Sequence, residues 1–148
     1  ALKETQAAAR DLGIQIQPVG VGDPGQFQAA YAAIARGHAE ALIIFNSSFT
    51  LAHRKQLTEL AAQRRLPTMC GEASWAEDGG LIAYGYDREH QWRRAATFVD
   101  KILKGARAAD LPVEQPLQYN LVVNLKTAET LALKLPPSIM LRAHKLVR

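Results

Sequence analysis

The sequence predicts an α/β fold, a three-layer sandwich in which helices flank a mainly parallel sheet. Two apolar runs, residues 41–45 and 66–70, lack polar alternation, as strands buried on both faces do. Helical segments of roughly 12–16 residues separate the strands, which is typical of right-handed βαβ units. Up to residue 105 the elements follow the order α-β-α-β-α-β-β-α, and this order favours a parallel sheet.

Each of the two apolar runs breaks into a polar loop. These loops are residues 46–50, which begin Asn46-Ser47-Ser48, and residues 71–76, which begin Gly71-Glu72. Ligands of open α/β sheets sit outside the carboxyl ends of the strands. We therefore expect a small molecule to be held at these two loops.

The first elements are defined by their apolar spacing and their caps. Residues 2–12 form a helix that ends at Gly13, and alternation from Ile14 to Val19 predicts a strand near an edge. Asp23-Pro24 marks the start of the next helix. Its inner stripe is Phe27, Ala30, Tyr31 and Ile34. Because the opening helix has no strand before it, we expect a strand upstream of residue 1.

A second group of elements follows the first polar loop. Ser47, Ser48 or Thr50 can cap a helix that runs to about Arg65, and residues 81–86 form a strand after the turn at 77–80. Asp87 caps a long helix that ends at Gly105. The inner stripe of this helix is Trp92, Ala95, Ala96, Val99, Ile102 and Leu103. On this interpretation Trp92 belongs to the core.

The chain changes character at residue 106. Residues 106–116 read as an extended, proline-marked connection, and alternation over 118–125 predicts a strand with one wetter face. A short helix covers 126–135. A closing helix then begins at Pro136, with Ile139, Ala143 and Leu146 directed inward. We interpret 1–148 as a single α/β lobe, with 106–148 as its tail segment.

Composition excludes several classes of protein. The 148 residues are 48% hydrophobic and 22% charged, which is ordinary for a globular domain. No apolar run approaches the roughly 20 residues that cross a bilayer. The net charge is +4, but the basic residues are scattered and no recognition helix or stacking platform accompanies them. We therefore predict no nucleic-acid partner.

The residues of catalytic chemistry are not grouped in this sequence. The histidines His38, His53, His90 and His144 share no metal-ligand spacing. No nucleophile elbow, P-loop or dinucleotide fingerprint occurs. A single cysteine, Cys70, excludes an internal disulfide and is interpreted as a small buried hydrophobe. We predict no enzyme activity, no metal and no cofactor.

The tail resembles the carboxyl-terminal segment of a family of bacterial ABC-transporter substrate-binding proteins. The matching segments are DLPVEQP at 110–116, NLVVNLKTA at 120–128 and LPPS at 135–138. Weaker matches are FQAAYAAI at 27–34, His53-Arg54, GGL at 79–81 and DKILKG at 100–105. The resemblance covers essentially the whole chain.

The resemblance implies a fold and a role. Family members have two α/β lobes joined by a hinge, like the type I periplasmic binding proteins. They close on a small solute and deliver it to a membrane permease. Full members are about twice as long and lie in the periplasm or on the cell surface, often lipid-anchored. This chain then corresponds to the second lobe, which agrees with the strand expected upstream. Some members are similar to binders of aromatic amino acids.

The loop after the first apolar run contributes four candidate ligand-binding residues. Asn46, Ser47 and Ser48 offer an amide and hydroxyl groups, and Phe49 offers a ring for stacking. The alternative is that Ser47 or Ser48 only caps the next helix and that Phe49 belongs to the core.

Four further candidates lie after the next two strands. Glu72, Ser74 and Trp75 suit an ammonium or an aromatic group, because tryptophan makes cation–π contacts. Tyr84, near the end of its strand, is a candidate wall of the cleft. The alternative for Trp75 is a partly buried loop tryptophan.

Three functions remain open from the sequence. The first is the solute-binding component of an ABC transporter, which binds a solute such as an amino acid between two lobes. The second is a ligand-sensing regulatory domain of the same fold, and the third is a small α/β enzyme. A lobe without its partner exposes apolar surface, so we also expect self-association through that face, giving a homo-oligomer.

Overall fold

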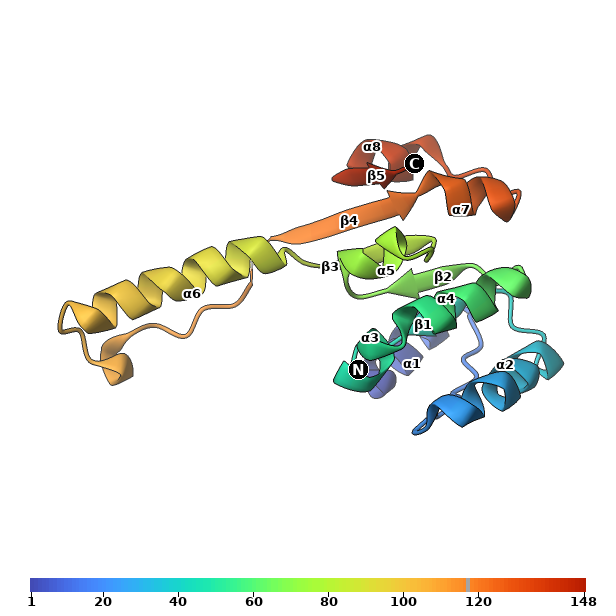
Figure 1. Cartoon of the computed structure of the whole chain (residues 1–148), viewed down its shortest axis with the longest axis horizontal. Coiled ribbons are helices and arrows are strands. Elements are labelled where there is room, and N and C mark those ends of the chain that lie inside the picture. The colour runs from blue at the N-terminus through green and yellow to red at the C-terminus, as the bar shows by residue number, and fades with distance from the viewer. Residues whose placement is uncertain (117) are drawn as a thin grey trace.

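The computed structural model describes residues 1–116 and 118–148 (Figure 1). The helices are α1 (Leu2–Asp11), α2 (Phe27–Arg36), α3 (Ser48–Ala52), α4 (Arg54–Gln63), α5 (Ala73–Glu77), α6 (Arg88–Leu103), α7 (Leu125–Thr130) and α8 (Pro137–Arg142). The strands are β1 (Leu42–Ile44), β2 (Thr68–Cys70), β3 (Ile82–Tyr86), β4 (Tyr119–Asn124) and β5 (Lys145–Val147). None of the helices in these two ranges combines the length and the apolar character needed to cross a bilayer.

The five strands form one sheet in the order β1-β2-β3-β4-β5. The β1–β2, β2–β3 and β4–β5 pairs are parallel, and only the β3–β4 pair is antiparallel. The predicted α/β class with a mainly parallel sheet is therefore confirmed. The carboxyl ends of β1, β2 and β3 lie at one edge of the sheet because these three strands run the same way.

The core lies where α2, α4 and α5 pack on one face of this sheet. The strands contribute Ile44, Cys70, Ala83 and Val122, which occupy matching positions across the register and are all buried. The helices contribute Phe27, Tyr31, Ile34, Leu57, Leu60, Ala61, Trp75 and Ala76. The stripe predicted for α2 is confirmed at Phe27, Tyr31 and Ile34. The Tyr31 hydroxyl donates a hydrogen bond to the carbonyl of Leu57 at 2.6 Å, which ties α2 to α4.

Buried polar side chains join the helices to the sheet. Asn124 Nδ2 donates to the carbonyl of Ala76 at 2.7 Å, and Asn124 Oδ1 accepts from the backbone of Thr127. The Thr68 hydroxyl accepts from the backbone of Leu81 at 3.0 Å. These bonds satisfy polar groups that burial would otherwise leave unpaired.

Four local predictions differ from the structure. The strand predicted from Ile14 to Val19 does not form. The backbone there has no partner strand among the described residues, and the Gln17 side chain instead donates to the carbonyl of Ala33 on α2. The helix predicted from the first polar loop breaks at His53 into α3 and α4. Most of the second polar loop is helical, because α5 covers Ala73–Glu77.

The fourth difference is at the end of the chain, where the predicted closing helix stops early. Helix α8 ends at Arg142, and Lys145–Val147 is the strand β5. A helix of this length stabilises few backbone hydrogen bonds on its own. Pairing with β4 offers a complete ladder instead, with Val122 opposite Lys145 and Asn124 opposite Val147.

The long helix α6 departs most from its prediction. It begins at the predicted cap, where Asp87 Oδ1 accepts from the backbone of His90 at 2.9 Å. However, all sixteen of its residues are described and none of them is buried. Trp92, predicted to lie in the core, is 70% exposed. Its stripe is correctly identified as apolar, but no element of the described chain packs against it.

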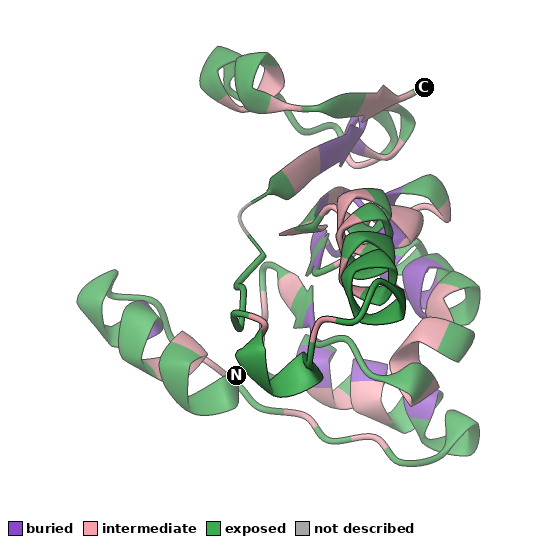
Figure 2. Cartoon of the chain, turned by 90° about the vertical axis from the view of Figure 1, so that its left-hand side faces the viewer, coloured by how far each residue is buried: buried purple, intermediate pink, exposed green. Residues whose placement is uncertain are grey.

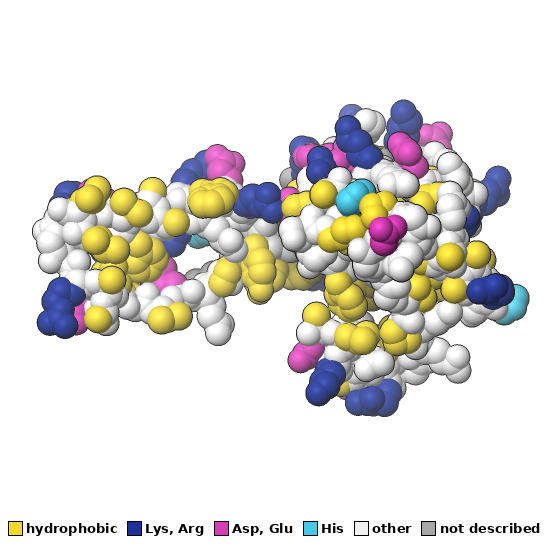
Figure 3. Space-filling model, turned by 60° about the horizontal axis from the view of Figure 1, so that its bottom comes forward, with side chains coloured by type: hydrophobic (Ala, Val, Ile, Leu, Met, Phe, Trp, Pro, Cys, Tyr) yellow, Lys and Arg dark blue, Asp and Glu magenta, His cyan; other side chains and the backbone are white. Residues whose placement is uncertain are grey.

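Helix α6 and the segment that returns beside it project from the body of the molecule as one unit (Figure 1). We call residues 88–116 the arm. In Figure 2 the buried residues gather in the body. Within the arm, Arg94 makes two hydrogen bonds to the carboxylate of Glu114, and its guanidinium lies 5.2 Å from the Phe98 ring centre. The space-filling view shows hydrophobic side chains along the arm and where it meets the body (Figure 3).

Candidate functional site

The two predicted loops meet at the carboxyl edge of the parallel strands. A Cβ placed on Gly71 would lie 3.1 Å from Asn46 Nδ2, so the loop after β1 touches the loop after β2. A Cβ placed on Gly85 would lie only 1.8 Å from the carbonyl oxygen of Gly71, so β3 touches the second loop as well. Glycine at position 85 is therefore a packing requirement, and the three strand ends form one continuous surface.

Glu72 places a carboxylate on this surface. Ser74 donates its hydroxyl to Glu72 Oε1 at 3.0 Å, and Arg88 donates its guanidinium to Glu72 Oε2. The Glu72 side chain is only 17% exposed, whereas that of Arg88 is 59% exposed. The structure thus brings two predicted residues, Glu72 and Ser74, together with an arginine that the prediction lacked.

In the loop after β1, one polar side chain caps a helix and two others are exposed. Ser47 caps α3, because its hydroxyl accepts from the backbone of Thr50 at 3.0 Å while Thr50 Oγ1 accepts from the backbone of Ser47 at 2.9 Å. This capping box is the alternative considered for Ser47. Asn46 and Ser48 are exposed, and neither side chain makes a hydrogen bond within residues 1–116 and 118–148. A solute contact by these two side chains stays a prediction.

Phe49 serves the core more than the surface. Its ring lies 5.7 Å from the ring of Phe27 and 4.9 Å from that of His53, and it packs against the buried cluster. Its ring is half-buried, so the expectation that it stacks on a solute gives way to the alternative that it belongs to the core.

Trp75 does not take part in the surface. It lies on α5 within the core and is 0% exposed, so the prediction that it contacts a solute is wrong. The reason is that the loop forms a helical turn, and this turn directs Trp75 toward α4 rather than toward solvent. The indole N–H of Trp75 has no hydrogen-bond partner within the described part of the chain.

Tyr84 faces the opposite side of the sheet from Glu72. Side chains alternate along a strand, so Tyr84 and Tyr86 point away from the face occupied by Gly85. Tyr84 stacks on Tyr119 of β4 with ring centres 5.5 Å apart, and Tyr86 lies 4.8 Å from the same ring. This exposed tyrosine cluster covers the ribbon that leads to the arm. A solute contact by Tyr84 stays a prediction.

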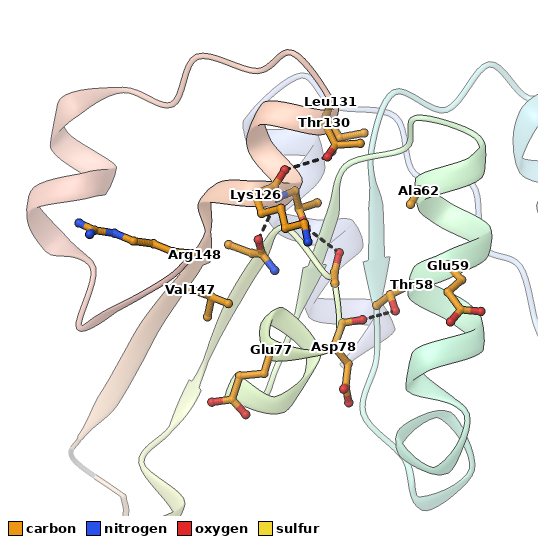
Figure 4. A pocket seen from close by; sticks show the side chains of 13 residues that line it. Thr58, Glu59, Ala62, Glu77, Asp78, Lys126, Thr130, Leu131, Val147 and Arg148 are labelled. Carbon is orange, nitrogen blue, oxygen red and sulfur yellow. Dashed lines mark hydrogen bonds between the residues drawn. The ribbon is translucent and has the colours of Figure 1, made fainter.

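A cavity of about 380 Å³ lies at the other end of the sheet, where the parallel strands begin (Figure 4). Its polar groups bond to one another: Thr58 donates to the carbonyl of Asp78 at 2.6 Å, and Thr127 donates to the carbonyl of Gly79 at 3.0 Å. The Asp78 carboxylate pairs with Arg54, and Glu77 pairs with Lys145 at 2.6 Å. The polar groups of the lining therefore form a structural network that joins α4, α5 and α7. This cavity lies at the opposite end of the sheet from the predicted site.

The remaining candidates for chemistry are inert or dispersed. Burial raises the pKa of the Cys70 thiol to about 12, so the thiolate is not populated at neutral pH. Within residues 1–116 and 118–148 no three histidine, cysteine or carboxylate side chains gather in a way that would hold a metal ion. The carboxyl edge therefore offers binding groups, namely an amide, a hydroxyl and a paired carboxylate.

Sequence reasoning missed Gly85 and Arg88 as parts of this surface, and it placed Gly71 in the second loop without giving it a role. A signal for Gly85 was present, because a glycine inside a strand often marks a close approach of another backbone. Arg88 follows the cap residue Asp87 and carries no such signal. Its partner Glu72 is sixteen positions earlier, and only the fold brings the two together.

Comparisons with solved structures show how the fold recurs. A conserved domain protein from Vibrio cholerae O1 biovar El Tor superposes with a TM-score of 0.87 at 22% identity, over 98% of this chain and 49% of that one. An ABC domain from Streptococcus pneumoniae, solved in complex with L-Trp, gives 0.88 at 19% identity, over 99% and 49%. A ligand-free, open substrate-binding protein with adhesive properties from Clostridium difficile gives 0.73 at 16% identity, over 99% and 48%.

The chain thus spans about half the length of these structures. A search among curated proteins found no match. The sequence profile of one family, described as ABC transporter substrate binding protein, matches residues 1–147. The parallel sheet, the surface at its carboxyl edge and this match over nearly every residue agree, and the chain belongs to the family of ABC transporter substrate-binding proteins.

Proposed function

We propose that this chain is one lobe of a two-lobed solute-binding protein that holds a small solute between its lobes. The observation that carries the proposal is the arm. Its stripe of Trp92, Val99, Ile102 and Leu103 is exposed, although such a stripe normally packs against another element. The chain also covers only half of each similar structure. A second lobe seated on the arm accounts for both observations.

The solute surface in this proposal is the carboxyl edge of the sheet. Asn46 and Ser48 present polar groups that have no hydrogen-bond partner among the described residues, and Glu72 and Ser74 present a carboxylate and a hydroxyl within the same surface. One open surface leaves a solute hydrated on its other side. Closure of a second lobe would remove that water and strengthen each polar contact.

We propose an amino acid as the solute. A carboxylate suits its ammonium group, while amide and hydroxyl groups suit its carboxylate. The Streptococcus pneumoniae structure was solved with L-Trp, which supports the same class for this family without assigning it to this chain.

The partner in this proposal is an ABC permease in the membrane, to which the closed protein delivers its solute. The full-length protein would then act in the periplasm or at the cell surface, with a lipid anchor as the means of attachment in the second case. Family membership supports this placement, because a substrate-binding component must meet its solute outside the permease.

Calorimetric titration tests the binding proposal. L-tryptophan, other amino acids, small carboxylates, amines and sugars are titrated into the full-length gene product and into the 148-residue chain. We expect saturable binding of an amino acid to the full-length protein and at least tenfold weaker binding to the single lobe, because one wall desolvates the solute only in part. Equal affinities would place the complete pocket within this chain and contradict the two-lobed proposal.

The arm also predicts self-association of the isolated chain. We expect sedimentation equilibrium to show a dimer that forms as concentration rises, because the exposed stripe gains by burial against a second copy. Replacing Val99 and Leu103 by Gln should shift the chain toward monomer. Leu141→Gln is the matched control, since Leu141 is at least as exposed as Val99 and Leu103 but lies on α8. A monomer at all concentrations, or an equal effect of the control, would contradict the proposal.

A further inference from the structure

Glu72 is held in a fixed position on the lobe. The backbone of Gly71 packs directly on Gly85, where a Cβ would lie 1.8 Å from the Gly71 carbonyl oxygen. The same Cβ position lies 3.5 Å from the backbone nitrogen of Glu72. The Ser74 hydroxyl then orients the carboxylate through Oε1. Glu72 therefore moves with the lobe.

Arg88 belongs to the arm instead. It is the first residue of α6, and its guanidinium bonds to Glu72 Oε2. Within residues 1–116 and 118–148 this is the only hydrogen bond or ion pair that joins a side chain of the arm to the rest of the molecule. The other ion pairs of the arm, such as Arg94 with Glu114, are internal to it. The ion pair between Arg88 and Glu72 thus connects the orientation of the arm to the carboxyl edge, and a solute group can replace Arg88 in it.

The two partners differ in how easily they leave the pair. The Glu72 side chain is 17% exposed, so its charge needs a cation beside it. Arg88 is 59% exposed and regains water when it leaves. An ammonium group that arrives at the carboxyl edge can therefore take the place of the guanidinium, and a solute without a positive charge cannot.

We propose that Glu72 selects solutes that carry an ammonium group. Until such a solute arrives, the Arg88 guanidinium occupies the position of the ammonium group on the Glu72 carboxylate, and the solute then displaces it. This inference rests on the proposed function and adds to it a specificity-determining residue and its competitor. Displacement breaks the hydrogen bond that, within residues 1–116 and 118–148, is the only one a side chain of the arm makes to the rest of the molecule. Solute binding and arm movement are therefore coupled through a single carboxylate.

The coupling makes a prediction that an ordinary structural ion pair does not. Removing the charge of Glu72 removes the attraction for the ammonium group, so Glu72→Gln should weaken binding of L-tryptophan by roughly tenfold to a hundredfold. Removing the competitor has the opposite sign, so Arg88→Met should tighten binding by about fivefold or more. Two partners of one ion pair should thus change affinity in opposite directions.

The experiment uses the full-length gene product with spin labels at Lys104→Cys on the arm and Gln63→Cys on α4. Both sites are exposed, whereas the native Cys70 is buried. Distances between the labels are measured by pulsed electron resonance, and affinities are measured by calorimetry. The probes are L-tryptophan, tryptamine, which lacks the carboxylate, and indole-3-propionate, which lacks the ammonium group. Arg93→Met is the control, because Arg93 pairs only with Glu89 on its own helix.

Without solute, Glu72→Gln and Arg88→Met should each shift or broaden the distance between arm and lobe, and Arg93→Met should not. With solute, L-tryptophan and tryptamine should produce a similar shift in the unmodified protein, and indole-3-propionate should not. Unchanged distances in both variants overturn the inference. Affinity changes of the same sign in both variants, or equal binding of indole-3-propionate, overturn it as well. If none of the probes binds, the amino-acid proposal fails, and the distances without solute decide the role of Arg88 separately.

Discussion

Helices α2 and α6 carry equally clear apolar stripes, yet their surroundings are opposite. On α2, Phe27, Tyr31 and Ile34 are all buried against α4 and the sheet. On α6, no residue of the stripe is buried, and the helix projects into solvent. An amphipathic stripe therefore shows that a face needs covering, but it does not show which part of a molecule covers it.

The two tryptophans give the largest expected contrast between these regions. Trp75→Ala should lower the free energy of unfolding of the 148-residue chain by about 3–5 kcal/mol, because the side chain is fully buried. Trp92→Ala should change it by less than about 0.5 kcal/mol, because Trp92 is largely exposed. Urea unfolding followed by circular dichroism measures both. In the full-length protein we expect Trp92→Ala to be destabilising, because a second lobe would cover Trp92. Equal effects of Trp92→Ala in the two proteins would contradict the proposal that a second lobe packs on the arm.

The contact between Gly85 and Gly71 gives the next effect. Gly85→Ala should destabilise the lobe by about 1–3 kcal/mol, since the new methyl group would meet a backbone carbonyl that cannot move aside cheaply. Gly20→Ala is the control, because open space surrounds that position. Thermal unfolding of both variants measures the difference. A neutral Gly85→Ala would mean that the loops at the carboxyl edge are not held against β3.

The packed region should also lose stability in alkali, whereas the arm has no buried thiol. Burial raises the pKa of Cys70 from near 9 to about 12 in the folded state. The stabilisation is complete below pH 9 and is lost as pH rises toward 12, by about 1.4 kcal/mol per pH unit. Burial raises the pKa of the Tyr31 hydroxyl in the same sense. Unfolding titrations at pH 8, 9 and 10 should therefore show a decline that is smaller in Cys70→Ala. An equal decline in both proteins would assign it to other groups.

Two neighbouring serines give the smallest and sharpest comparison. Ser47→Ala should cost about 1 kcal/mol of stability, because it removes a cap of α3. Ser48→Ala should leave stability unchanged and weaken solute binding by the full-length protein, because the Ser48 hydroxyl is exposed at the carboxyl edge and has no partner in the part of the chain that the structure describes. Thermal unfolding and calorimetry separate the two effects. Loss of stability in Ser48→Ala would assign it to the structure rather than to the solute.

The sequence predicted most of the lobe for reasons that are local. The strands β1 and β2, the cap at Asp87 and the stripe of α2 all follow from spacing within a few residues, and the structure confirms them. Burial of β1 and β2 on both faces was predicted wrongly, because Ile43 and Met69 are 47% and 42% exposed. The predictions for residues 14–19 and 145–147 were wrong because pairing with a distant strand, or its absence, decides whether an extended segment becomes a strand.

The meeting of the two loops was predicted, whereas the directions of their side chains were not. The two loops do meet at the carboxyl edge, as parallel strands require, and Glu72 and Ser74 are joined there. The prediction for Trp75 was wrong because the helical turn after Glu72 directs the Trp75 side chain into the core. Tyr84 lies on the other face because strand side chains alternate.

The sequence by itself determined the class of the fold, the edge of the sheet at which the loops converge, and the family. These depend on periodicity, caps and short motifs, which act over a few residues. Only the tertiary structure decided that the stripe of α6 is uncovered, that Trp75 is buried, and that Arg88 meets Glu72 across the base of the arm. Each of these three features depends on which segments, distant in the sequence, lie next to one another in the fold. Local propensity does not determine that arrangement.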